Sequence, residues 1–506
     1  MPRQPIQTLV PSWVQQRYVL SVMLLLAVMN MYTMRVCLSV AIVEMVSHTD
    51  GDGSGAAAVV DPERCDPPGG NQTAAGDDSD ASPAHPVGEF SWTPSHQGVI
   101  LSSFYYGYVV SHLPGGVFAD RFGGKHALGL GLLVTSVTTL LSPAAARIGS
   151  GYLIALRIIM GLGEGVTFPA ISALLSEWIP PCERSRLGAF VYAGAQLGSV
   201  LGTAGGGLAL HYLEWPATFY IFGALGMAWY ALWLVLCYSS PAKHPFISQE
   251  ERDFLTHQIK QVGEESAARS STPWRGILTS KPVWGLVVIQ VGHDWGFFTM
   301  LTDLPKYMRS VLRFDIAQNG LLSSLPYLTM WGMSMVFGAL ADWLIARGCL
   351  SVLNVRRLFT SVASLTCAVG IIAASFAGCD WVAVVALLTA GLGGMGGAYC
   401  GMRVNALDLS RRHAGTVMAL VNGVGAISGI VSPLLIGMLT PHETMAEWRL
   451  TFWIVFGVLF VTNTVYVLLA RADIQPWDRP SATELEAPCP GPPPVGGAVP
   501  GGAKIM

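Results

Sequence analysis

The stretch Gly116–Arg121, GVFADR, returns 222 positions later as Gly338–Trp343, GALADW. A second stretch, Glu214–Tyr220 with the sequence EWPATFY, returns 233 positions later as Glu447–Trp453, EWRLTFW. Two matches in the same order and at similar offsets are hard to obtain by chance. They indicate that the chain contains two copies of one unit that run in the same direction, an arrangement typical of membrane proteins whose halves rock around a central cavity.

Each copy contains six apolar runs. Charged residues make up 12% of the 506 residues, against about 25% in soluble domains. A spanning helix needs about 20 mostly apolar residues, and these runs are too long to be barrel strands. We therefore predict an all-α membrane protein with twelve transmembrane helices in two six-helix halves. The predicted spans are 18–46, 95–118, 126–146, 151–178, 187–212 and 217–238, followed by 282–306, 318–342, 356–376, 381–402, 414–438 and 448–471.

The segments between and beyond these runs differ in composition. An acidic, Gly- and Ala-rich loop at 47–94 interrupts the first half, and a segment of mixed charge separates the halves. Ser248 stands three residues before Glu251, which is the spacing of a capping box and predicts a short helix through Lys260. The Pro- and Gly-rich end is predicted to be disordered. The expected organisation is an N-terminus at 1–17, a first half at 18–238, a central loop at 239–281, a second half at 282–471 and a tail at 472–506.

Lysine and arginine are distributed unequally between the two sides of this predicted bundle. The side with both termini and the central loop holds 20 of the 29, the other side holds six, and three lie in or at the edge of helices. The positive-inside rule therefore predicts that both termini are cytoplasmic. The 47–94 loop then faces outward, where Asn71 begins a glycosylation motif. We expect a monomer in the plasma membrane, with a lysosomal or vesicular membrane as the alternative.

The repeated stretch itself predicts a gate. Its small residues allow close helix approach, and its charged residues can latch the two halves at their cytoplasmic ends. The alternative is a tight basic loop that only fixes topology. The residues assigned to gating are Asp120, Arg121, Lys125 and, in the second copy, Asp342.

Three charged residues lie in the middle of predicted helices of the first half. They are Arg35, Arg157 and Glu164. An ionised group at this depth costs about 2.5–3.5 kcal/mol on insertion scales, so such residues face an interior cavity. A guanidinium binds carboxylate or phosphate through two parallel hydrogen bonds, which predicts that Arg35 and Arg157 bind an anion. Glu164, seven residues after Arg157 on the same helix face, is the predicted proton carrier. The alternative is that Arg157 extends its side chain to the membrane interface, or that Arg157 and Glu164 form a structural pair.

The second half contributes weaker candidates. His293 and Asp294 are adjacent in the first helix of that half, and they are predicted to bind substrate and to couple transport, respectively. Tyr106 and Tyr192 carry hydroxyl groups that can donate to an anion, and Asn405 can make polar contacts between halves. The nine cysteines form no CxxC pair or His/Cys cluster, so no metal and no cofactor is predicted besides a co-transported sodium ion or proton. The net charge of −3 gives no reason to expect a nucleic-acid partner.

Several motifs resemble one known family. The stretches RVCLSV at 35–40, LPGG at 113–116, GEGVTFPA at 163–170 and YAGAQLG at 192–198 are similar to those of the anion–cation symporter family of the major facilitator superfamily. That family includes sialin, the vesicular glutamate transporters and the sodium–phosphate cotransporters. The stretches GHDWGFFTM at 292–300 and DLPKYM at 303–308 look most like the insect inorganic phosphate cotransporters. The resemblance implies transport of a small anion, such as inorganic phosphate or an acidic sugar, coupled to sodium or protons.

Three positions depart from the members of that family. Met160 stands where sialin has a second acidic residue, which leaves Glu164 alone. His293 and Leu101 stand where the glutamate transporters have an arginine and a histidine, which argues against glutamate as substrate. An organic-anion uniporter or exchanger, or a membrane receptor that transports nothing, is the alternative. An enzyme is not expected, because the sequence contains no metal cluster, nucleophile elbow or phosphate-binding loop.

Overall fold

The computed structural model describes residues 15–46, 88–245, 247–255, 273–410 and 413–478, and for a few helical residues among them, including Asp120 and Arg121, it describes the backbone only. Within these ranges the protein is all-helical, and one isolated bridge joins Val46 and Phe90. Its helices form twelve long segments, as the hydropathy pattern predicts. They are α1 (Gln16–Met45), α2 (Pro94–Phe122), α3 (Gly124–Ile148), α4 (Ser150–Gly165) with α5 (Thr167–Trp178), α6 (Pro181–Tyr192) with α7 (Gly194–Val200), a π-helical turn (Leu201–Gly205) and α8 (Gly206–Tyr212), α9 (Trp215–Leu236), α12 (Lys281–Ser310), α13 (Ile316–Ala346), α14 (Val352–Phe376), α15 (Trp381–Gly394) with a 3-10 turn (Met395–Ala398) and α16 (Met402–Leu409), α17 (Ala414–Gly425) with α18 (Ser428–Leu439), and α19 (Met445–Leu469).

Several predicted single spans are broken helices. The span predicted at 151–178 bends at Val166, between α4 and α5. Pro169 explains the bend, because it has no N–H to donate to the Gly165 carbonyl and its ring crowds that group. The span at 381–402 breaks in a glycine-rich turn after α15 and extends further as α16.

Ten of the twelve segments are long and apolar enough to cross a membrane by length and composition, counting described residues. The other two, α2 and α12, are more polar. They are also helices that face the opposite half, since Tyr105 of α2 packs on Phe298 of α12 with ring centroids 4.8 Å apart. Their polarity therefore agrees with burial between the halves rather than contact with lipid.

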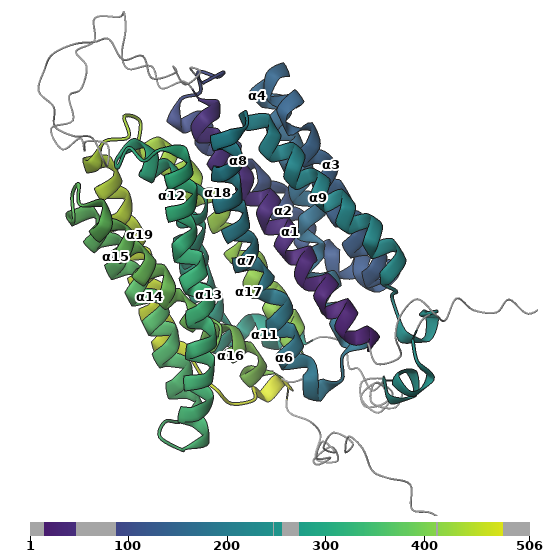
Figure 1. Ribbon diagram of the computed structural model, residues 1–506. Helices are drawn as coiled ribbons and strands as arrows, with labels where there is room; N and C mark the ends of the chain where they lie inside the picture. The colour runs from purple at the N-terminus through teal and green to yellow at the C-terminus, as the bar shows by residue number, and fades with distance from the viewer. Residues whose placement is uncertain (1–14, 47–87, 246, 256–272, 411–412, 479–506) are drawn as a thin grey trace, which may run out of the picture.

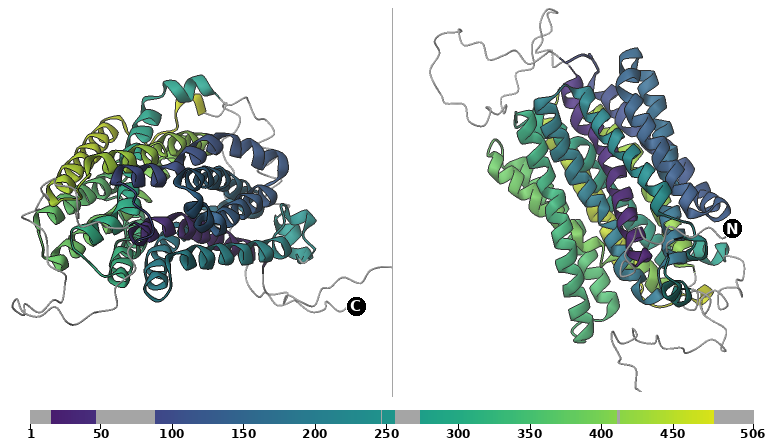
Figure 2. Two further views of the ribbon diagram at one scale, coloured as in Figure 1. Left: turned by 90° about the horizontal axis from the view of Figure 1, so that it is seen from above. Right: turned by 45° about the vertical axis from the view of Figure 1, so that its right-hand side comes forward.

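The two halves lie side by side, with the purple-to-blue helices of the first half against the green-to-yellow helices of the second (Figures 1 and 2). They meet at two glycine contacts. A methyl group added at Gly207 of α8 would lie 2.6 Å from the Cα atom of Gly320 of α13, and one added at Gly98 of α2 would lie 2.5 Å from the Pro433 carbonyl oxygen of α18. Only residues without a side chain allow helices to approach so closely.

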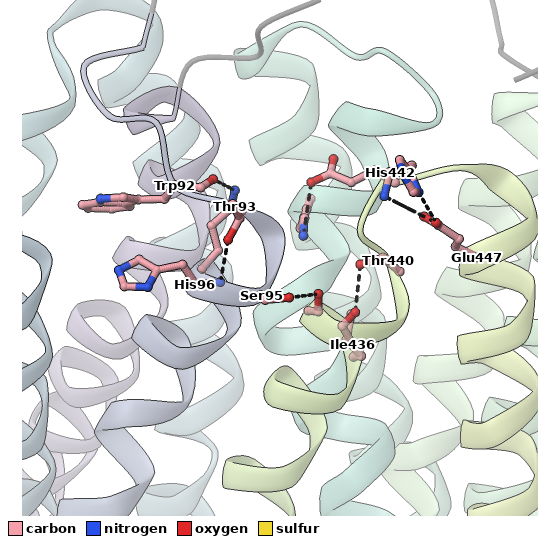
Figure 3. A network of polar contacts seen from close by, with 12 residues as sticks. Trp92, Thr93, Ser95, His96, Ile436, Thr440, His442 and Glu447 are labelled. Carbon is pink, nitrogen blue, oxygen red and sulfur yellow. Dashed lines mark hydrogen bonds and ion pairs between the residues drawn. The ribbon is translucent and has the colours of Figure 1, made fainter. Parts of the chain in front are cut away.

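These two contacts are copies of each other. Gly98 and Gly320 are 222 positions apart, which is the offset of the repeated GVFADR stretch, and Gly207 is 230 positions before Gly437, which lies next to Gly98. The second helix of each half therefore packs on the fifth helix of the other. At the same end of the bundle, the Ser95 hydroxyl donates to the Gly437 carbonyl oxygen at 3.0 Å (Figure 3). The halves are thus in contact at the end where α2 begins and α18 ends.

The described chain begins and ends at the opposite end of the bundle. The backbone N–H groups of Gln16 and Arg17, at the start of α1, donate to the Glu251 carboxylate at 2.9 and 3.2 Å. A carboxylate here satisfies free N–H groups of α1 and matches its dipole. The Ser248 side chain accepts from the Glu251 backbone N–H at 3.2 Å, so half of the predicted capping box forms. The Glu251 side chain does not complete the box, because it accepts from the start of α1 instead of from the Ser248 backbone N–H. Residues 256–260 of the predicted helix lie outside the described residues.

The described start of the C-terminal tail, residues 472–478, contacts the second half, and the rest of the tail predicted to be disordered lies outside the described residues. The Gln475 N–H donates to the Leu409 carbonyl oxygen at 3.0 Å, and Asp478 lies 2.9 Å from His413 Nδ1. Trp477 packs on Gly276 of α11 (Trp274–Thr279). Residues 472–478 therefore fold against the ends of the second half, because apolar and polar partners are available there.

Candidate functional site

Arg35 lies in the middle of α1 inside a cage of aromatic rings. Its guanidinium carbon lies 4.6 Å from the ring centroids of Tyr32 and Phe104 and 5.1 Å from that of Tyr108. The side chain is buried. Ring faces attract a cation electrostatically, most strongly where water is excluded, so this cage partly offsets the cost of placing a charge in the bundle.

Glu164 of α4 completes this arrangement. Its Oε2 atom accepts hydrogen bonds from Arg35 Nη2 at 2.5 Å and Nε at 3.1 Å. The side chain is 0% exposed, and its Oε1 atom has no hydrogen-bond partner in the described part of the chain. The ion-pair partner of Glu164 is therefore Arg35 and not Arg157, which lies on the same face of the helix. Seven residues along a helix correspond to about 10 Å of rise, which is too far for an ion pair.

Arg157 is consequently left without a carboxylate. Its Nη1 atom donates to Met160 Sδ at 3.6 Å, which is a weak acceptor, and its Nε atom has no partner among the described atoms. The guanidinium carbon lies 5.3 Å from the Phe104 ring centroid, so the same ring lies beside both Arg35 and Arg157. A buried guanidinium with unused donors is able to bind an anion.

His293 and Asp294 of α12 lie on the side of the second half. Asp294 Oδ1 accepts from Gln290 Nε2 at 2.8 Å, and its carboxylate lies next to Gly425 of α17. The His293 ring is parallel to that of Phe297 at 6.4 Å. Both side chains are buried, and both lie within electrostatic reach of Arg403, a residue that the sequence analysis did not include in the site.

Arg403 of α16 is a third interior arginine. Its guanidinium carbon lies 5.4 Å from the Tyr399 ring centroid, and its buried Nε atom has no hydrogen-bond partner in the described residues. Tyr399 in turn accepts a hydrogen bond from Gln196 of α7, so this corner of the site touches both halves. The sequence signal is an arginine two residues after the glycine-rich stretch 391–401, one of the three basic residues in or at the edge of predicted helices.

The other polar residues predicted for the site are placed differently. Tyr106 is 41% exposed, one step round α2 from Tyr105, whereas Tyr105 and Tyr108 face inward. The buried Tyr105 hydroxyl has no partner among the described atoms, so Tyr105, and not Tyr106, offers an unused hydroxyl inside the bundle. Tyr192 shares a hydrogen bond with Ser172 at 3.2 Å and lies within electrostatic reach of Arg403.

Asn405 does not belong to this site. Its Nδ2 atom donates to the Arg471 carbonyl oxygen at 2.8 Å, and its Oδ1 atom accepts from the Tyr466 hydroxyl at 3.2 Å. It also lies 3.4 Å from Asp408, which Arg356 binds at 2.7 Å. Because its hydrogen-bonding groups are used by protein atoms, Asn405 packs the second half instead of contacting a substrate.

The gating residues are only partly described. Lys125 at the start of α3 donates to the Leu234 carbonyl oxygen at 3.2 Å and lies 4.1 Å from the Tyr238 ring centroid, so these contacts remain within its own half. Asp342 is exposed near the end of α13. The side chains of Asp120 and Arg121 lie outside the described residues, as does Asn71. Of the cysteines, Cys379 is disulfide-bonded, which the scattered cysteine positions did not indicate.

The comparisons with known proteins agree with this architecture. Residues 23–433 match the model of the Major Facilitator Superfamily. The chain is 39% identical over 475 residues to a "Putative inorganic phosphate cotransporter" of Drosophila melanogaster, covering 92% of this chain and 87% of that protein. It is 38% identical to sialin of Homo sapiens, covering 94% of each, and 36% identical to vesicular glutamate transporter 1 of Bos taurus, covering 79% of this chain and 71% of that protein.

Solved structures show the same fold at low identity. A bacterial homologue of the human lysosomal transporter Spinster, in an inward-facing conformation, aligns with a TM-score of 0.63 at 14% identity and covers 92% of this chain and 99% of that chain. The xylose transporter of E. coli in an inward-open conformation aligns with a TM-score of 0.62 at 13% identity, covering 90% and 96%. The predicted twelve-helix fold and the expectation of a transporter rather than an enzyme are confirmed. The chain belongs to the Major Facilitator Superfamily, in the branch that contains sialin, the vesicular glutamate transporters and the inorganic phosphate cotransporters.

Proposed function

We propose that this transporter moves a small anion, inorganic phosphate or an organic anion such as sialate, by alternating access coupled to sodium or protons. The relatives named above support an anionic substrate. The observation that carries the proposal is Arg157, which is buried in the middle of the bundle with no carboxylate partner among the described residues. A permanently charged, unpaired guanidinium is costly in this environment, and a bound anion offsets that cost.

Arg35 and Glu164 supply a route for coupling. While Glu164 is ionised, it occupies two donors of Arg35. Protonation of Glu164 removes that negative charge and frees Arg35 to bind the anion beside Arg157. Entry of an anion and entry of a proton then favour each other, which is the reciprocity that linked binding requires. Asp294 is the second coupling candidate, because its buried carboxylate lies in the opposite half.

The access gate is assigned to the repeated loops. Asp120 and Arg121 near the end of α2, Lys125 at the start of α3 and Asp342 near the end of α13 are the residues proposed to latch the cytoplasmic ends of the two halves, because α2 and α13 are helices that contact the opposite half. We place both termini in the cytoplasm, following the lysine and arginine distribution, and favour the plasma membrane. A vesicular or lysosomal membrane remains the alternative.

The direct test is transport by purified protein in proteoliposomes. Uptake of radiolabelled phosphate, sialate and urate is measured with sodium and proton gradients imposed separately. One of the anions accumulating against its gradient only when a cation gradient is present supports the symporter. Equilibration without accumulation supports the alternative, an organic-anion uniporter or exchanger. Binding with no flux of any anion contradicts the proposal and favours a receptor.

A further inference from the structure

The half-buried Arg403 differs from Arg356, a buried arginine of the second half. Arg356 is fully used by the protein, because it donates to Asp408 at 2.7 and 3.4 Å and to the Cys400 carbonyl oxygen at 2.7 Å. Arg403 donates no such hydrogen bond to the described protein atoms: its buried Nε atom has no partner, and its guanidinium carbon lies 5.4 Å from the Tyr399 ring centroid, which is a weaker cation–π contact. Arg356 is therefore a strut, whereas the donors of Arg403 are unused.

The groups around Arg403 come from both halves. On its own side it is within electrostatic reach of Asp294 and His293, and on the other side it is within reach of Tyr32 and Tyr108, the rings that cage Arg35, and of Tyr192. Asp294 is the one carboxylate in this group, and it forms no ion pair with Arg403 within 4.0 Å in the described structure. The negative charge of Asp294 thus moderates that of Arg403 but does not use its donors.

We propose that Arg403 is a second anion ligand, contributed by the C-terminal half, and that the site selects anions carrying two negative charges. This proposal rests on the proposed function of the same site. Arg157 is buried and Arg403 is half-buried, each has a buried Nε atom without a hydrogen-bond partner among the described residues, and the two belong to opposite halves. A divalent anion neutralises both guanidinium groups, whereas a monovalent anion leaves one charge uncompensated. An anion that touches both halves also favours the state in which the halves close around it.

The test compares binding of divalent and monovalent anions. Purified protein is titrated with inorganic phosphate near pH 8, where it is chiefly divalent, with a dicarboxylate such as succinate, and with the monocarboxylate sialate. The wild-type protein is expected to prefer at least one divalent probe. Arg403→Gln is expected to weaken binding of that probe by about tenfold or more and sialate binding by less than about threefold, because one charge-assisted contact is lost. Arg157→Gln is expected to weaken both.

Matched variants separate this role from folding. Arg275→Gln, at an exposed arginine of α11 outside the bundle, is the control and is expected to bind as the wild type does. Arg403→Lys keeps the charge and loses the fork, so it should keep the preference for the divalent probe at weaker affinity. This variant also tests the proposal if the glutamine variant does not fold.

The outcomes that overturn the proposal are specific. Equal weakening of both anion classes by Arg403→Gln, no weakening of either, or a wild-type protein that binds sialate more tightly than both divalent probes each contradicts it. So does recovery of divalent binding in the double variant Arg403→Gln/Asp294→Asn, because Arg403 would then only balance Asp294. A wild-type protein that binds no anion contradicts the proposed function itself, which distinguishes the two failures.

Discussion

Arg35 on α1 donates two hydrogen bonds to one oxygen of Glu164 on α4, at 2.5 and 3.1 Å, while the other oxygen of Glu164 has no partner in the described part of the chain. The pair is enclosed by Tyr32, Phe104 and Tyr108. An ion pair this deeply buried does not by itself indicate stability, because desolvation offsets much of the attraction. Its position beside Arg157, which has no carboxylate partner in the described part of the chain, instead supports the proposal that protonation of Glu164 changes what the arginines can bind.

Glu164→Gln is therefore expected to uncouple transport. The neutral side chain resembles protonated Glu164, so anion exchange should continue while accumulation driven by a proton gradient is lost. Removing one partner of a buried pair also costs about 3–5 kcal/mol, so thermal stability should fall, and Glu164→Asp serves as the control that keeps a carboxylate. Exchange and gradient-driven uptake are measured on the same liposomes. Normal accumulation by the glutamine variant would show that coupling lies elsewhere, with Asp294 the next residue to test.

Arg157→Lys is expected to lower anion uptake sharply while the protein still reaches the membrane. Lysine keeps the positive charge but loses the planar fork that binds two oxygens at once. A charge-assisted hydrogen bond contributes about 1.5–3 kcal/mol, so affinity should fall by about ten- to a hundredfold. Initial uptake rates over a range of anion concentrations, normalised to surface protein, measure this. Near-wild-type affinity would remove Arg157 from the binding site.

The helices could be predicted from the sequence, whereas most contacts within the site could not. Hydropathy and the two repeats place twelve spans, and the span predicted at 356–376 is α14, Val352–Phe376. Periodicity also places Arg157 and Glu164 on one face of a helix. It cannot show that Arg35, 129 positions earlier, lies closer to Glu164, because that depends on how α1 packs against α4.

The sequence also could not show which of several neighbouring side chains on a helix faces the interior of the bundle. Three tyrosines occur at 105, 106 and 108, and the sequence analysis selected Tyr106, which is exposed, instead of Tyr105, which is buried. Asn405 and Arg403 are two residues apart. Asn405 forms hydrogen bonds with a backbone carbonyl and a tyrosine hydroxyl, whereas Arg403 has unused donors. Residue type identifies which side chains can bind an anion. Only the packing shows which of them are free to do so.

Lower pH is expected to reduce the stability of the protein through His244, which packs against the end of the first half. His244, after the end of α9, lies 4.7 Å from the Tyr238 ring and 5.5 Å from the Trp178 ring. Burial lowers the pKa of His244, the contact of its Nε2 atom with the Leu236 carbonyl oxygen opposes this shift in part, and the charges of Lys125 and Arg252 lower the pKa further. The folded state therefore binds this proton less readily than the unfolded state does. Above about pH 6.5 His244 is neutral in both states and the free energy of unfolding is at its full value. Below that pH the free energy of unfolding declines, by at most about 1.4 kcal/mol per pH unit.

The measurement is the melting temperature of purified protein between about pH 7.5 and 5. The wild type should lose stability across this range, and His244→Gln should melt earlier at neutral pH but show a shallower pH dependence. Equal pH dependence in the two proteins would assign the effect to other groups.

The contact between the halves at the end where α2 begins leads to the last prediction. Gly320→Ala places a methyl group 2.6 Å from the Gly207 Cα atom and 2.7 Å from the Thr203 carbonyl oxygen, and backbone atoms cannot move aside as a flexible side chain can. Overpacking of this kind costs about 1–3 kcal/mol, and here the cost falls only on the conformation in which α8 and α13 touch. The equilibrium should therefore shift towards the state in which this end is open, by about fivefold or more.

Gly332→Ala is the matched control on the same helix, since a methyl group there meets no atom within 4 Å. The readout is the rate at which a bulky maleimide labels a cysteine introduced at Gln97, a buried residue between the halves at this end. Because Gly98 and Gly320 are equivalent positions of the two copies, Gly98→Ala should raise the rate in the same way. An unchanged rate in both alanine variants would mean that these glycines pack the helices in every conformation and do not separate during transport.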